Sequence, residues 1–150
     1  MTQAADTAYL EISRIFDAPR ELVYQAFVDP DQLSEWFGPA GFSVPRESVD
    51  IDARVGGRKR FVMAKDENPA DGHEINATFT EVIENEVLDS EGFVGTDGLR
   101  LQLRIELYDE PGGKTRLELR QGPYTPEFKT DAARGWESSF TKLDALLKLA

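Results

Sequence analysis

Residues 99–107 have the sequence LRLQLRIEL and decide the fold of this chain. Every second residue is leucine or isoleucine, and the residues between them are arginine, glutamine or glutamate. Side chains of a β-strand alternate between two faces, so this stretch predicts a strand with one buried and one water-facing side. Residues 115–120 repeat the pattern after a Pro-Gly-Gly turn, which predicts an antiparallel partner strand.

Five further segments have strand character, although none alternates as cleanly. Their apolar residues recur two apart, and most of the segments end at turns that contain glycine, proline or aspartate. In the first of them Arg14 falls on the apolar side, and we expect a bulge or the strand end to turn it outward. The segments are 9–16, 42–52, 58–65, 74–83 and 86–94, and a further turn is expected at 96–98.

Two short helices are predicted directly after the first strand. Residues 20–28 have helical spacing of apolar side chains, with Asp17 as the expected N-cap and Pro19 in the first turn. Asp29-Pro30 interrupts this helix, because a residue that precedes proline avoids the helical conformation. The second helix, 31–36, ends before a Gly-Pro pair.

The last segment predicts a long amphipathic helix that begins at about Pro126 or Thr130. About twenty helical residues span about 30 Å, the width of a small domain. The apolar stripe of this helix and the apolar face of the sheet must bury each other. A strongly twisted sheet curls around such a helix and leaves an apolar gap that suits a small ligand. The stripe consists of Ala133, Trp136, Phe140, Leu143 and Leu147.

The composition indicates a single globular domain and argues against several classes of partner. The net charge is −11, which repels nucleic acid and anionic membranes. The absence of cysteine excludes disulfides, thiolate chemistry and cysteine-based zinc sites. Residues 1–7 have no basic or apolar targeting pattern, and no apolar run approaches the roughly 20 residues of a membrane span. We therefore expect a cytoplasmic protein, as a monomer or a homodimer.

Short motifs spread along the chain carry a family resemblance. They are 16–23 (FDAPRELV), Asp29-Pro30, 36–39 (WFGP), 55–58 (VGGR), 113–117 (GKTRL) and Gly135-Trp136. In this order they resemble the single-domain bacterial proteins of the Hsp-90 ATPase activator homologue-like (AHSA-like) family. That family belongs to the START/SRPBCC superfamily, which shares its fold with the birch-pollen allergen. The resemblance extends from about residue 8 to residue 149.

The resemblance and the patterns imply the same architecture. It is an α+β helix-grip (START-like) fold, in which a curved antiparallel sheet of six to seven strands surrounds a long C-terminal helix. Two short helices follow the first strand. One domain is expected over residues 1–150, with an ordered core at about 8–149. The superfamily includes lipid and hormone binders as well as polyketide cyclases, so the resemblance implies no single activity.

Twelve residues are candidates to line the cavity. They are inward-facing strand residues, aromatic residues of the last helix, and the aromatic pair after the second short helix. Trp36 and Phe37 are alternatively anchors of that short helix, and many of the strand residues are alternatively ordinary core. The candidates are Trp36, Phe37, Phe61, Met63, Ile75, Phe79, Leu101, Leu103, Leu117, Leu119, Trp136 and Phe140.

The sequence shows no catalytic or metal-binding constellation. His73 is the only histidine and follows a polar loop, so we expect it to be exposed. Asp50 and Asp52 share a strand face opposite apolar neighbours and are expected to face water. Tyr24 and Tyr124 stay open as polar groups of the cavity. No catalytic residue, metal or cofactor is predicted.

Three functions remain open. The first is the binding of a small hydrophobic molecule, lipid-like or aromatic, in a cavity of roughly a few hundred cubic ångströms. The second is an enzyme of cyclase or hydrolase type in the same cavity, which requires an ionisable group there with a shifted pKa. The third is a protein-interaction module with a chaperone partner, by analogy with the eukaryotic co-chaperones that carry this domain.

Overall fold

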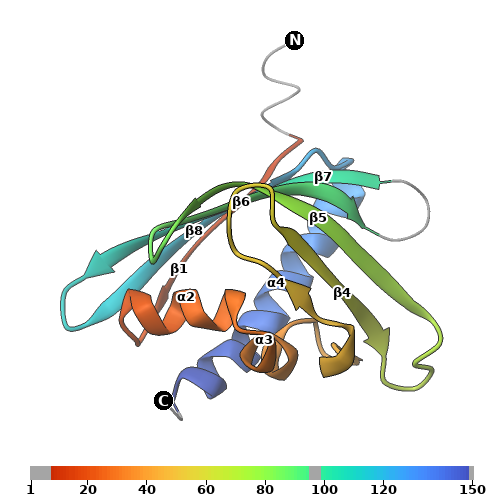
Figure 1. Ribbon diagram of the computed structural model, residues 1–150, viewed down its shortest axis with the longest axis horizontal. Helices are drawn as coiled ribbons and strands as arrows, with labels where there is room; N and C mark the ends of the chain where they lie inside the picture. The colour runs from red at the N-terminus through yellow and green to blue at the C-terminus, as the bar shows by residue number, and fades with distance from the viewer. Residues whose placement is uncertain (1–7, 95–98, 149–150) are drawn as a thin grey trace.

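A curled antiparallel sheet covers one side of the long helix α4 (Pro126–Leu147). The computed structural model describes residues 8–94 and 99–148, so the turn expected at 96–98 and the segment 1–7 lie outside the described residues. Figure 1 shows α4 passing beneath the sheet, with the two short helices on the same side. These are α2 (Arg20–Val28) and α3 (Pro30–Trp36). The arrangement confirms the predicted helix-grip fold.

The sheet is antiparallel throughout its path β1-β8-β7-β6-β5-β4-β2, and β3 pairs with β4. Within the described residues it has six long strands and two strands of two residues each, in agreement with the predicted six to seven. The strands are β1 (Leu10–Phe16), β2 (Phe42–Ser43), β3 (Asp50–Ile51), β4 (Arg58–Lys65), β5 (Gly72–Ile83), β6 (Val87–Val94), β7 (Leu99–Glu110) and β8 (Lys114–Gly122).

The two faces of the sheet differ as the alternation predicts. On the inner face, Ile105 pairs with Leu119 and both are buried. On the outer face, the Arg104 guanidinium donates to Glu81 at 2.7 Å and to Glu106 at 2.8 Å. The hydrogen bond from Arg104 lowers the pKa of the Glu106 carboxyl. Apolar side chains therefore face the helices, and paired charges face water.

Two local predictions are wrong. Asp17 is not the N-cap of α2, because Pro19 occupies that position and provides no side-chain cap. Residues 42–52 do not form one strand, because a short 3-10 helix, η1 (Arg46–Ser48), separates β2 from β3. Pro45 has no N–H for the sheet, and its carbonyl accepts hydrogen bonds from the backbone and hydroxyl of Ser48.

Arg14 does not turn outward, contrary to the prediction. The β1–β8 register is continuous through the pair Arg14–Leu117, so no bulge reverses the alternation. The guanidinium instead meets α4, where it donates to Glu137 at 3.2 Å and to Asp144 at 2.5 Å. Its central carbon also lies 5.6 Å from the centroid of the Phe140 ring. Carboxylates of the helix thus satisfy a charge that the sheet directs inward.

The β1 end of the inner face is solidly packed. Phe16, Trp36 and Phe140 are fully buried, and the Phe16 and Phe140 rings meet edge to face at 5.3 Å. The Trp36 indole N–H donates to the Ala26 carbonyl at 2.8 Å. This contact fixes α3 against α2 and satisfies the polar tip of a buried aromatic residue.

Within residues 8–94 and 99–148, no helix is long and apolar enough to cross a bilayer.

Candidate ligand-binding pocket

Small residues of β5 and β6 create a hollow on the inner face. Ala77 of β5 pairs with Gly92 of β6, and Ser90 lies two residues before Gly92 on the same face. A Cβ atom on Gly92 would lie 2.2 Å from the carbonyl oxygen of Asn76, so only glycine permits this approach of the strands. The sheet therefore stays intact at this point while offering little side-chain volume.

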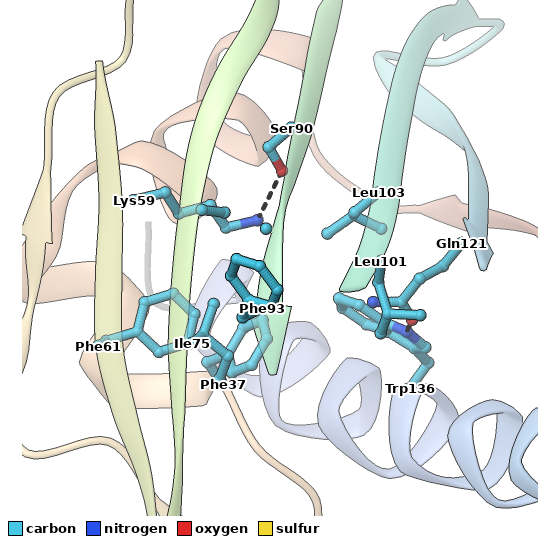
Figure 2. Close-up of a pocket in the computed structure, with 12 residues that line it drawn as sticks. Phe37, Lys59, Phe61, Ile75, Ser90, Phe93, Leu101, Leu103, Gln121 and Trp136 are labelled. Atoms are coloured by element: carbon cyan, nitrogen blue, oxygen red, sulfur yellow. Dashed lines mark hydrogen bonds between the residues drawn. The ribbon is translucent and has the colours of Figure 1, made fainter. Parts of the chain in front are cut away.

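The hollow contains a cavity of about 50 Å³ between the sheet and α4. Figure 2 shows aromatic residues along its helix side. The Phe37 ring packs against Phe61 at 4.8 Å and against Trp136 at 5.5 Å, and these rings fill part of the gap. The cavity is consequently smaller than the few hundred cubic ångströms expected from the sequence. Its walls are Phe37, Lys59, Phe61, Ile75, Ala77, Ser90, Gly92, Phe93, Leu101, Leu103, Gln121 and Trp136.

The structure divides the predicted cavity residues into two groups. Those that line the cavity are Phe37, Phe61, Ile75, Leu101, Leu103 and Trp136. Those that lie outside its described walls are Trp36, Met63, Phe79, Leu117, Leu119 and Phe140. Most of the second group is buried in the core that the aromatic residues of α3 and α4 already fill. Contact with a ligand stays a prediction for the lining group.

Lys59 is the feature that the sequence reasoning missed. Its side chain points into the pocket, and its ammonium group reaches the Ser90 hydroxyl at 3.5 Å, the long limit for a hydrogen bond. No aspartate or glutamate belongs to the described lining. Burial lowers the pKa of the Lys59 ammonium from 10.5 to about 8. Lys59 as a whole residue is half-buried, and the pocket has an open side.

Gln121 is a second polar residue of the pocket that was missed. The Trp136 indole N–H donates to its Oε1 at 2.8 Å, and both residues are largely buried. This bond assigns the oxygen to the indole and leaves the amide NH₂ as the free end of the side chain. The alternation contained the signal for both residues. Lys59 has the same parity as Phe61, and Gln121 has the same parity as Leu119.

The other polar candidates lie elsewhere. His73 is exposed as expected and stacks on Phe42, with ring centroids 6.1 Å apart. Asp50 faces water and pairs with Arg58 at 2.8 Å, which lowers the pKa of its carboxyl. Tyr24 and Tyr124 lie outside the described walls of the cavity, and burial raises the pKa of both phenols.

Solved bacterial structures share this architecture. Protein CV1439 from Chromobacterium violaceum is 26% identical, covers 94% of this chain and 97% of its own, and superimposes with a TM-score of 0.84. The AHSA1 protein from Silicibacter pomeroyi is also 26% identical, with 94% and 98% covered and a TM-score of 0.81. Protein Ms6760 from Mycobacterium smegmatis, at 24% identity, covers 95% of this chain and 92% of its own with a TM-score of 0.79, and shows the fold alone.

The fold and the pocket define a helix-grip protein of the SRPBCC superfamily. Residues 17–148 match the family described as Activator of Hsp90 ATPase homolog 1-like protein, and the chain belongs to that family. The resemblance seen in the sequence motifs is thereby confirmed. The sequence matches no curated protein.

Proposed function

We propose that this protein binds a small hydrophobic molecule in the pocket between the sheet and α4. The observation that supports this function best is the hollow above Ala77, Ser90 and Gly92, because a well-packed interior would fill such a space. The pocket has a mostly apolar wall with a few polar groups, which is how small-molecule sites are usually built. The fold is one that commonly accommodates hydrophobic ligands.

The ligand places one end in the enclosed cavity and extends through the open side. The cavity volume of about 50 Å³ corresponds to about two water molecules of the liquid. A larger ligand requires a lining side chain to move, and we expect this side chain to be Phe37. It lies in the segment between α3 and β2 and is only half-buried, whereas a hydrogen bond to Gln121 holds Trp136 in place.

Filling the hollow tests this function. Ala77→Leu adds three carbon atoms on the inner face of β5, and Thr78→Leu adds a similar apolar group on its exposed outer face. A ligand at a hundred times its dissociation constant stabilises the wild type by about 2.7 kcal/mol, or about 5–10 °C in Tm. We expect hydrophobic compounds from a thermal-shift screen to lose this effect with Ala77→Leu and to keep it with Thr78→Leu. An equal shift with both variants would place binding outside the pocket.

The enzyme alternative gains one observation. It requires an ionisable group with a shifted pKa inside the cavity, and Lys59 has that property. A general acid or base normally works beside a second polar group that orients it or shares the proton. The described lining offers no carboxylate, histidine or tyrosine for that role. Binding is therefore the function that the pocket supports better.

A further inference from the structure

We propose that the ligand is an apolar molecule with a carboxylate, and that this group pairs with Lys59 and accepts a hydrogen bond from Ser90. The inference rests on the proposed function and names the chemical class of its ligand. It starts from a charge that the fold places in an apolar pocket without a counter-charge.

Lys59 reaches the hollow because its neighbour across the strands is small. In the β4–β5 register Lys59 pairs with Ala77, which in turn pairs with Gly92 of β6. The lysine side chain therefore passes over Ala77 and brings its ammonium group to Ser90 on β6 (Figure 2). A bulky residue at position 77 would block this path. The same small side chains thus create the cavity and admit the charge.

The pocket provides no anion for this ammonium group. The elements around it contribute apolar or uncharged side chains to the described walls, from Phe37 on one side to Leu101 and Trp136 on the other. Asp89 precedes Ser90 on β6, but it points to the outer face and is held by Arg104 at 2.9 Å. A charge taken from water without a partner is unfavourable, and a ligand carboxylate removes that penalty.

The remaining polar side chains of the described pocket lining can act as hydrogen-bond donors. The oxygen of the Gln121 amide already accepts from Trp136, so its NH₂ is the group left for a ligand. The Ser90 hydroxyl can donate once the ammonium group has a stronger acceptor. With a pKa of about 8, Lys59 is about 90% protonated at pH 7. An ammonium group beside a hydroxyl matches the two acceptor oxygens of a carboxylate.

Matched probes with the same apolar body test the inference. Octanoate and octanol form one pair, and 4-phenylbutyrate and 4-phenylbutanol form a second pair with an aromatic body. Each is titrated by calorimetry into wild type, Lys59→Met and Lys65→Met. Lys65 lies on the same strand but outside the described pocket walls, where it pairs with Asp71 at 2.9 Å. Thermal melts establish that each variant is folded.

We expect at least one acid to bind wild type and Lys65→Met about tenfold to a hundredfold more tightly than its alcohol, the range for hydrogen bonds to a charged group. In Lys59→Met this ratio falls to about one, while the alcohol binds at least as well as before. The preference of the wild type for the acid also declines as the pH rises above about 8, because Lys59 loses its proton.

Two results overturn the inference and leave the proposed function intact. One is equal affinity of the wild type for acid and alcohol, and the other is a preference for the acid that persists in Lys59→Met. If the wild type binds none of the four probes, the proposed function fails for both ligand shapes, and the inference fails with it.

Discussion

Arg14 and Lys59 both occupy inward positions of the sheet, toward opposite ends of its strand order, and their surroundings differ. Arg14 of β1 meets two carboxylates of α4 and lies against the buried Phe140 ring. Lys59 of β4 meets one hydroxyl at 3.5 Å and a described wall without carboxylates. Helix α4 provides Glu137 and Asp144 as partners for Arg14. At the pocket of Lys59 the same helix provides the Trp136 side chain.

The difference separates a charge that is paired within the fold from the charge that we propose pairs with a ligand. A basic residue that packs between a sheet and a helix is stabilised when the helix provides its partner, as at Arg14. At the hollow, the described lining contains no carboxylate for Lys59, and the proposed partner is the carboxylate of a ligand. Three sets of substitutions test this comparison by measuring what each end contributes to the free energy of unfolding.

The largest effect is expected at the packed end. Phe140→Ala removes a fully buried ring that contacts Phe16 at 5.3 Å and Trp36 at 6.2 Å, and we expect a loss of about 4 kcal/mol. Phe37→Ala is the matched change at the hollow end, and it should lose less because Phe37 is half-buried and borders the cavity. Urea denaturation measures both. Equal losses would mean that the two ends are packed alike.

Lys59→Met is expected to raise the free energy of unfolding, whereas the two phenylalanine substitutions lower it. Lowering the pKa from 10.5 to about 8 corresponds to roughly 3 kcal/mol, and the partial exposure of Lys59 reduces this to about 1–3 kcal/mol of stabilisation at pH 7. The unfolded chain keeps the Lys59 proton to higher pH than the folded chain, so wild-type stability rises between pH 8 and 10.5. The advantage of the variant is full below pH 8 and disappears by about 10.5. Urea titrations across this pH range would contradict the idea if Lys59→Met were destabilised at pH 7.

The smallest effect is expected for Arg14→Met, a loss of about 1–2 kcal/mol. The change keeps the apolar stem but leaves Asp144 without its arginine, and the Arg14 side chain is only 23% exposed. The same arginine-to-methionine change at the exposed pair Arg54–Asp52 serves as the control and should alter stability by no more than about 0.5 kcal/mol. Chemical denaturation at low and high salt measures the loss. A stabilised Arg14→Met would remove the contrast with Lys59.

Alternation in the sequence predicted the strands and their faces, because one buried side leaves a period of two in the residues. It did not predict the hollow, because Ala77, Ser90 and Gly92 come together only through the register of β5 and β6. The alternation placed Arg14 on the apolar side, but its partners lie 123 and 130 residues away and could not be identified from the sequence. The inward position of Lys59 was predictable from its parity with Phe61, but the predicted lining included only apolar and aromatic residues.

Gly92 has a consequence for how ligand preference can diverge among related proteins. Because a side chain there would collide with the backbone of β5, this position is fixed by the architecture. Ala77 and Ser90 face the same space without that constraint, and each borders the end of Lys59. Substitutions at these two sites change the shape and polarity of the hollow and leave the pairing of the strands unchanged. The hollow therefore has one position that must be glycine and two positions at which other side chains fit. Ligand preference can then change at these two positions without a change of fold.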